Sequence, residues 1–335
     1  MSEPSHPSSD WRRFIAISAL LVIGLAAAPL WADRAGLRLL GEMYSLLTLA
    51  LLWNLLAGYA GLLSVGQQAF VGIGGYTLFS ATIFLGVSPY VAILLGIVLA
   101  ALAAALFAPL LFRLEGAYFA IGSWVAAETI YLVFTMIPQL GGGAGMSLPA
   151  AVVRGIAEDR STREFIIYWL LLAAGTGTLF GAYALLRSKV GLALTALRDN
   201  PTAAASLGID IWRAKFWTYV GVAAAVSAVS SLIFLQKLRI SPASGFSLND
   251  WTVTIIFIVV IGGIGRLEGA IVGTAVYFLL REFLANLGPV YMIVLGTIAI
   301  ITMIFARRGI WGFLEARFGW SLLPTTRLPP HEDKI

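Results

Sequence analysis

Cysteine is absent from the 335 residues, and histidine occurs only as His6 and His331. Disulfides, thiolate catalysis and cysteine-ligated metal sites are therefore excluded. Both histidines lie in polar segments near the ends of the sequence, so no histidine pair is available for a buried metal ion. The sequence has no GxxxxGK[ST] phosphate-binding loop, so we do not expect the chain itself to hydrolyse ATP. Carboxylates clustered at helical spacing are also missing, and these absences together argue against an enzyme.

Charge is scarce as well. Charged residues make up 12% of the chain and hydrophobic residues 59%, with a mean hydropathy of +0.90. A soluble protein of this size could not bury so much apolar surface, so the composition predicts an all-α polytopic membrane protein. The net charge of +5 comes from basic residues scattered between apolar runs. That scatter favours contact with anionic membrane lipid and excludes nucleic acid as a partner.

The apolar residues form about ten runs, each close to the ~20 residues that a bilayer core requires. We expect transmembrane helices at 14–30, 37–58, 66–86, 89–112, 117–137, 165–186, 216–236, 251–265, 269–287 and 289–306. We interpret the first run as an uncleaved helix, with a cleavable signal peptide as the alternative. The transmembrane domain then covers residues 14–306, between an N-terminal tail (1–13) and a C-terminal tail (307–335).

Most of the 22 basic residues fall on one side of this arrangement. The positive-inside rule places that side, together with both tails, in the cytoplasm. Residues 187–215 are then cytoplasmic and residues 138–164 form an external loop. Runs two to five are expected to cross the membrane in the opposite direction to runs seven to ten, and each set contains a glycine-rich interruption. This pattern predicts broken helices and an inverted repeat, with a solute path at the repeat interface.

Residues 187–215 are a structured interruption rather than a slack loop. Asn200 can cap a helix, Pro201 suits its first position, and Gly208 suits its end. The two turns between them are too short to be stable alone, and their side chains are small. We therefore expect this helix to dock against another protein. The alternative is an amphipathic connector that lies on the lipid headgroups.

A second stretch, 58–76, combines six glycines with Gln67 and Gln68. Irregular backbone at membrane depth is tolerated only against protein or a water-filled cavity, so the two glutamines are candidates for contact with a solute. The alternative is close packing of helices through small residues such as Gly72 and Gly75.

A third stretch, 240–252, leads into the eighth apolar run. Ser247 or Asn249 can cap that helix, and Asp250 in its first turn suits the positive end of the helix dipole. A role for Asp250 as an outer gate residue is the alternative.

Ionisable residues inside the apolar runs are few, the clear ones being Glu42, Glu128 and Arg281. An intramembrane carboxylate is a candidate functional residue, and Glu128 is the strongest of them. A proton-driven carrier usually needs several such groups in series, and their absence argues against a carrier. Near residues 262–273 we also expect a structural contact between Arg266 and Glu268.

Four motifs stand in a fixed order over residues 37–310. They are GxxGxxSxGxxxFxGxGxY, then Arg-Asp-Asn before an Ala-Ala pair and Leu-Gly, then Ser-Pro followed by Phe, and a Gly-Gly-x-Gly turn. In this order they resemble the permease subunits (M-type) of branched-chain amino acid ABC importers. The matching residues include Gly58, Gly61, Ser64, Gly66, Phe70, Gly72, Gly74, Tyr76, Arg198, Asp199, Asn200, Ala203, Ala204, Leu207, Gly208, Ser241, Pro242 and Phe246.

The resemblance implies a companion permease, two cytoplasmic ATPase subunits and a periplasmic or lipid-anchored solute-binding protein, in a bacterial inner membrane. ATP and Mg would bind to the partner subunits, and this chain would bind no cofactor. We assign coupling to the ATPases to Arg198, Asp199, Asn200, Pro201, Ala203, Ala204, Leu207 and Gly208. We assign the translocation path to Gln67, Gln68, Phe70, Gly72, Gly74, Tyr76, Glu128, Asn249 and Asp250.

Two other classes stay open, namely an ion-coupled secondary carrier and a membrane-embedded enzyme. The carrier needs ligands for a coupling ion within the spans, and the enzyme needs clustered reactive side chains. For the permease, the apolar path suits a neutral or zwitterionic solute. Branched-chain amino acids are the first expectation, with urea, short amides and aromatic acids as alternatives.

Overall fold

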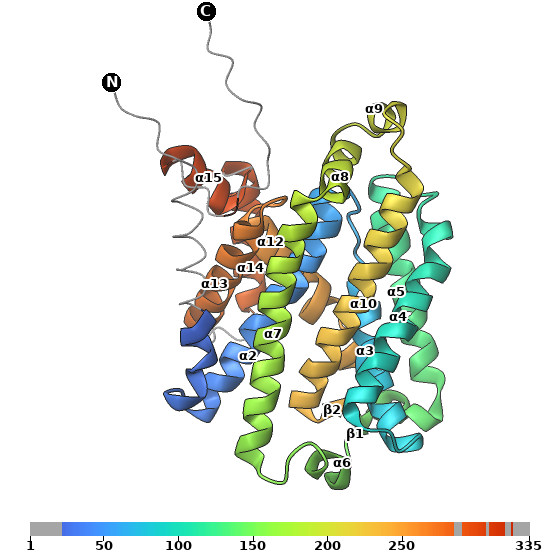
Figure 1. Ribbon diagram of the computed structural model, residues 1–335, viewed down its shortest axis with the longest axis vertical. Coiled ribbons are helices and arrows are strands. Elements are labelled where there is room, and N and C mark those ends of the chain that lie inside the picture. Colours follow the sequence, from blue (N-terminus) through green and yellow to red (C-terminus); the bar gives the residue numbers. More distant parts are fainter. Residues whose placement is uncertain (1–21, 285–289, 306–307, 319–322, 324–335) are drawn as a thin grey trace, which may run out of the picture.

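The computed structural model describes residues 22–284, 290–305, 308–318 and 323, and these fold into a bundle of helices (Figure 1). The predicted tail at 1–13, the beginning of the first apolar run, and most of the tail at 307–335 lie outside the described residues. Within them, six helices are long and apolar enough to cross a membrane. The prediction of an all-α polytopic membrane protein is confirmed.

The elements follow one another along the chain in three groups. The first group is η1 (Ala28–Leu30), α2 (Arg34–Asn54), the π-helical η2 (Leu55–Tyr59), α3 (Gln67–Phe84), α4 (Pro89–Leu111) and α5 (Ala117–Met136). The second is η3 (Pro138–Leu140), η4 (Gly142–Ala144), β1 (Met146–Ser147), α6 (Ala150–Arg154), α7 (Arg160–Arg187), α8 (Lys189–Asp199) and α9 (Pro201–Ser206). The third is α10 (Ile211–Lys237), β2 (Arg239–Ile240), α11 (Pro242–Gly245), the π-helical η5 (Leu248–Val253), α12 (Thr254–Gly262), α13 (Leu267–Leu284), α14 (Val290–Phe305) and α15 (Gly309–Phe318).

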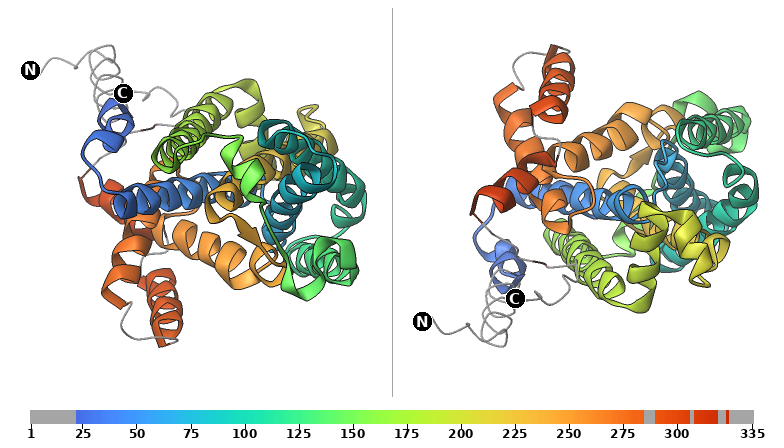
Figure 2. Two further views of the ribbon diagram at one scale, coloured as in Figure 1. Left: turned by 90° about the horizontal axis from the view of Figure 1, so that it is seen from below. Right: turned by 90° about the horizontal axis from the view of Figure 1, so that it is seen from above.

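Two long helices form the centre of the bundle. α10 packs against α3 and α4, and α2 packs against α7. Viewed along the bundle, α4 and α5 lie on one side, with α14 and α15 on the other (Figure 2). The close approach of α4 follows from small residues repeated every four positions, which occupy one helix face. These residues are Ala92, Gly96, Ala100, Ala104 and Ala108, and all are buried.

Helices are interrupted at the two places where the sequence predicts it. α2 passes into η2, and irregular backbone over residues 60–66 leads to the start of α3. In the second half, α11 and η5 precede α12. The predicted run 251–265 needs correction, since the helical region begins at Leu248 and ends at Gly262. The helix cannot continue further because Gly263 adopts a φ of 129°.

The two ends of the bundle carry different structures (Figure 1). At one end α9 projects, and we call this the α9 end. At the other, the α6 end, β1 pairs antiparallel with β2 beside α6, with Met146 opposite Ile240. The predicted loop 138–164 is therefore partly ordered structure. α7 begins at Arg160, earlier than the predicted Phe165, because the Asp159 side chain accepts hydrogen bonds from the first turn.

Candidate functional site: the coupling segment and the buried glutamines

Residues 187–215, which we call the coupling segment, fold around two short helices, α8 and α9. The hydroxyl of Ser188 caps α8 by accepting from a backbone N–H of its first turn at 3.1 Å. The side chain of Asn200 caps α9 by accepting from the N–H of Ala203 at 3.0 Å. Gly208 follows α9 with a φ of 81°. The predicted helix start and end are confirmed.

α9 has one side that faces outward and one that packs on its own chain. Ala203 is exposed, and Leu207 is 79% exposed. Ala204 is only 1% exposed, on the side where α9 contacts α8 and α10. Of the predicted Ala-Ala pair, only Ala203 is therefore open to another protein, while Ala204 holds the helix against its own bundle.

Arg198 joins the coupling segment to the broken end of α2. Its Nη1 donates to the carbonyl oxygen of Gly58 in η2 at 2.6 Å, and its Nε donates to Asp199 Oδ1 at 2.8 Å. Gly58 is the second-last residue of η2, and the last carbonyls of a helix lack an intrahelical donor, while a guanidinium donates in several directions at once. The bond therefore ties α8 to the position where α2 breaks.

Asn54, which the sequence analysis missed, completes this connection. Its side chain is fully buried, accepts from the N–H of Gly265 at 2.8 Å and donates to the carbonyl of Arg266 at 2.9 Å. The turn between α12 and α13 is thereby fixed to the end of α2. The feature of the sequence that points to Asn54 is an amide side chain inside a long apolar run. We call Asn54, Gly58, Arg198 and Gly265 the inner junction.

The two glutamines lie at the first turn of α3, each 1% exposed. Thr252 Oγ1 in η5 donates to Gln68 Oε1 at 2.5 Å and accepts from the Gln68 N–H at 3.2 Å. The two broken regions of the bundle therefore meet at this pair. Within the described part of the chain, neither side-chain polar atom of Gln67 has a hydrogen-bond partner. A buried amide without partners is costly, so Gln67 is suited to bind a polar group that enters the bundle.

An aromatic cluster lies further along α3 toward the α6 end. The ring of Tyr76 stacks on Phe246 with centroids 5.9 Å apart and contacts Phe134 at 5.1 Å. Phe246 also covers Gly72, where a larger residue would collide with its ring. Phe70 packs edge-on against Tyr219 at 5.7 Å.

Small residues on α3 allow α10 and the segments next to it to pack closely against α3. Gly74 faces Ser227 and Ser230, and its carbonyl accepts from Ser231 at 3.0 Å. Gly75 lies against Phe234 and Ile240. The packing interpretation of these glycines is confirmed, and their place along a solute path stays a prediction.

The remaining predicted path residues lie on exposed surface. Glu128 is exposed on α5, the least buried of the apolar spans, and Asn249 and Asp250 are exposed in η5. The helix cap is Ser247, which accepts from the Asp250 N–H at 3.1 Å. All three side chains are exposed in this chain, and their place along a solute path stays a prediction.

Two other ionisable residues pair across the bundle. Arg281 on α13 donates to Glu42 on α2 through two hydrogen bonds, of 2.7 and 2.9 Å. The expected contact between Arg266 and Glu268 is wrong. Arg266 pairs with Glu315 of α15, and Glu268 accepts from the N–H of Leu323 at 2.5 Å. Residues two positions apart at the start of a helix do not face each other, which explains the difference.

Most of the chain matches a known protein family. The model of that family, described as branched-chain amino acid transport system / permease component, matches residues 36–305. The chain belongs to this family. With its six long apolar helices, it is a multi-pass membrane permease.

Individual members of the family show the extent of the similarity. The high-affinity branched-chain amino acid transport system permease protein LivM of Salmonella typhimurium is 27% identical over 330 residues, or 92% of this chain and 77% of its own. The LivM protein of Escherichia coli is 26% identical over 331 residues, with the same coverage. The probable LivH permease of Methanocaldococcus jannaschii is 30% identical over 146 residues, covering 40% of this chain and 44% of its own. No solved structure gives a significant match.

Proposed function

We propose that this chain is one of two permease subunits of an ABC importer that moves branched-chain amino acids into the cell. The observation that carries this proposal is the contact between Arg198 of α8 and Gly58, which links the coupling segment, with its projecting helix α9, to a broken membrane helix. An ion-coupled carrier has no need for such a helix. The partners are a companion permease, two cytoplasmic ATPase subunits and an external solute-binding protein.

The proposed topology has ten transmembrane segments and both termini in the cytoplasm of a bacterial inner membrane. Support comes from the six long apolar helices and from the shorter helices α3, α13 and α14 beside them. The α9 end is then cytoplasmic, and the α6 end faces outward. The meeting of the two broken regions at Gln68 and Thr252 supports an inverted repeat, because such repeats place their interrupted helices at a common interface.

The proposed mechanism begins at the partner ATPases, which bind ATP and Mg. When they close, they push against the exposed side of α9, and α8 moves with it. Arg198 passes this displacement to η2, and Asn54 passes it to the turn between α12 and α13. Because η2 leads to α3 through residues 60–66, the position of Gln67 changes with the state of the ATPases. ATP thereby shifts the population between inward-open and outward-open forms.

The test is uptake of labelled leucine into vesicles that hold this chain, the companion permease and the ATPase subunits, with the binding protein outside. We expect uptake to require ATP. Ala203→Trp, on the exposed side of α9, should abolish both uptake and retention of the ATPases during purification. Ala173→Trp is the matched control, because it makes the same change at an exposed position of α7.

The alternatives give different results in the same vesicles. Uptake by this chain without ATP, driven by an ion gradient, would identify a secondary carrier and contradict the proposal. Full uptake by the Ala203→Trp variant would contradict coupling through α9. Competition by urea, a short amide or an aromatic acid, measured against leucine, decides among the substrate classes.

A further inference from the structure

One side of α5 is left uncovered by the rest of the described chain. α5 is the least buried of the six long apolar helices. Its exposed residues recur every three or four positions, so they lie along one side of the helix. The central ones, which we call the α5 stripe, are Trp124, Val125, Glu128, Thr129, Leu132 and Val133.

Glu128 lies near the middle of this helix as well as of the stripe. The 20 residues of α5 extend for about 30 Å, which is the thickness of a bilayer core. Glu128 is the twelfth of them, so any placement that spans the bilayer puts its carboxylate close to the midplane. Within the described part of the chain, the Glu128 side chain makes no hydrogen bond or ion pair.

Lipid is a poor neighbour for the α5 stripe. A carboxylate at the centre of a bilayer is costly, and such side chains almost always face protein or a water-filled cavity. α4 provides the contrast, because it has no charged residue and its exposed side carries apolar residues such as Leu94, Leu102 and Leu106. The exposed side of α4 therefore suits lipid, whereas the exposed side of α5 calls for another protein.

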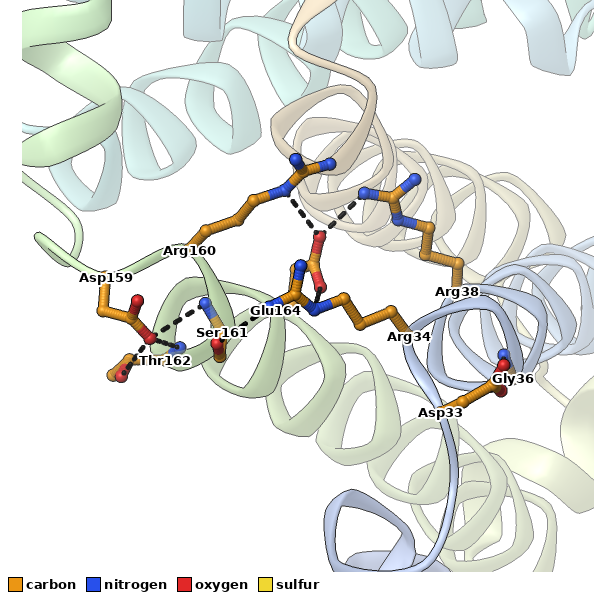
Figure 3. Close-up of polar contacts among 9 residues, drawn as sticks. All are labelled: Asp33, Arg34, Gly36, Arg38, Asp159, Arg160, Ser161, Thr162 and Glu164. Carbon is orange, nitrogen blue, oxygen red and sulfur yellow. Dashed lines mark hydrogen bonds and ion pairs between the residues drawn. The ribbon is translucent and has the colours of Figure 1, made fainter.

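Carboxylates at the α6 end of the bundle are provided with partners. Glu164 accepts from Arg38 at 2.7 Å and from Arg160 at 3.3 Å (Figure 3). Asp159 accepts from two backbone N–H groups in the first turn of α7, at 3.0 and 3.2 Å. The chain thus pairs carboxylates that lie near the bundle end. Glu128, in the middle of an apolar helix, has greater need of a partner and receives none from the described residues.

The stripe belongs to an edge of the bundle that carries only negative charge. η5 and α12 pack beside α14, and Phe246, just before η5, contacts Tyr131 and Phe134 of α5 at 6.2 and 5.0 Å (Figure 2). η5 exposes a second carboxylate, that of Asp250. None of α5, η5, α12 and α14 contains a basic residue. The complementary surface is therefore one that brings positive charge.

This charge also distinguishes a different subunit from a second copy of the same chain. In a symmetric pair that packs through the stripe, both copies of α5 cross the membrane in the same direction. The two Glu128 side chains then face each other at the same depth. Like charges repel strongly where the dielectric constant is low. A companion of different sequence avoids this repulsion and can present a basic side chain instead.

We propose that the companion permease packs against the α5 stripe and that one of its basic side chains pairs with Glu128. The pair satisfies a carboxylate that this chain leaves without a partner, and polar contacts of this kind hold membrane helices together. The proposal rests on the proposed function, which supplies the companion. It identifies the face by which the two permeases are joined and explains why they are different proteins.

The first experiment uses cross-linking in the assembled transporter in nanodiscs. The chain has no native cysteine, so one introduced cysteine can carry a thiol-reactive photo-cross-linker. Val125→Cys, one turn from Glu128, should capture the companion permease, which mass spectrometry identifies. Leu102→Cys on α4 is the matched control, because Val125 and Leu102 are 57% and 60% exposed, and it should capture lipid. Capture from Val125→Cys of lipid alone, or of a second copy of this chain, would overturn the proposal.

The second experiment tests the charge of Glu128. Glu128→Leu leaves the basic side chain of the companion unpaired, so the apparent Kd between the two permeases in detergent should rise by about tenfold or more. Glu128→Asp keeps the charge and should restore most of the association. A stripe that faces lipid gives the opposite result, because Glu128→Leu then removes a costly charge. Native association together with a higher melting temperature for that variant would contradict the proposal.

The failure of this inference is distinguishable from that of the proposed function. If the companion permease purifies with the native chain but Val125→Cys does not capture it, only the assignment of the α5 stripe is overturned. If no companion permease purifies with the native chain and uptake does not require one, the proposed function is wrong and this inference falls with it.

Discussion

The guanidinium of Arg198 and the carbonyl of Gly58 lie 2.6 Å apart, although 140 residues separate them in the sequence. Arg198 ends the first helix of the coupling segment, and Gly58 lies in the π-helical turn where α2 breaks. A carbonyl at a helix end lacks an intrahelical donor, and a hydrogen bond to an ionised donor contributes about 1.5–3 kcal/mol. The bond can therefore transmit a movement of the coupling segment into the membrane domain.

The first prediction concerns this bond. Arg198→Ala should leave the exposed side of α9 intact, so the ATPase subunits should still purify with the permease. Leucine uptake should fall by about tenfold or more, in line with the loss of a charge-assisted hydrogen bond. ATPase activity should lose its stimulation by the loaded binding protein. The control is Arg213→Ala, since Arg213 pairs with Asp210 on the surface and with no other residue of the described chain. Loss of the ATPases from the Arg198→Ala complex would show that the residue contacts the partner instead.

The second prediction separates the two glutamines, which are equally buried. Gln68→Leu removes the oxygen to which the Thr252 hydroxyl donates, while the bond from the Gln68 backbone N–H remains, so it should destabilise the protein by about 1–3 kcal/mol. Gln67→Leu removes an amide that has no partner in the described chain, so the melting temperature should stay the same or rise. If Gln67 contacts the solute, the same variant should raise KM for leucine. An unchanged KM for Gln67→Leu would remove this residue from the path.

Local signals in the sequence explain what could be predicted. Asn200 and Pro201 determine the start of α9 through their own backbone and side chain, so neighbouring residues suffice. The glycines of 58–76 indicate a break because no other residue tolerates such close backbone contacts. The long apolar runs likewise require membrane helices whatever their packing partners are.

Contacts between distant segments explain what the sequence could not predict. Asn54 bonds to a turn more than 200 residues away, and nothing adjacent to it indicates that turn. Ala203 and Ala204 are identical neighbours, and only the packing of α9 on α8 and α10 distinguishes the exposed one from the buried one. A carboxylate in an apolar run marks Glu128 as a candidate path residue, but which way it faces depends on how α5 packs against other helices, and its role stays a prediction.

The third prediction tests the inner junction through its glycines. A Cβ atom on Gly58 would lie 2.5 Å from the backbone nitrogen of Gly265 and 2.7 Å from its Cα. Backbone cannot move aside as a side-chain tip can, so Gly58→Ala should destabilise by about 1–3 kcal/mol and lower uptake. Gly221→Ala in α10 is the control, because a Cβ there meets no atom within 4 Å. That variant should be neutral or stabilising by up to about 1 kcal/mol. Equal melting temperatures for both variants would contradict the packing at the junction.

The fourth prediction concerns Glu42 and Arg281, whose two hydrogen bonds tie α2 to α13. The side chains of Glu42 and Arg281 are 45% and 35% exposed, so the pair is neither fully exposed nor fully buried. A fully exposed ion pair contributes little to stability, whereas removing one partner of a buried pair is strongly destabilising. Glu42→Gln should therefore cost about 1–3 kcal/mol by leaving the guanidinium without its carboxylate. Arg281→Met in the same chain should recover most of that loss, because the uncompensated charge is then gone. Thermal melting of the two single variants and the double variant gives the coupling energy of the pair. Additive losses would show that the two side chains act independently, and that the attachment of α13 to α2 depends on apolar packing alone.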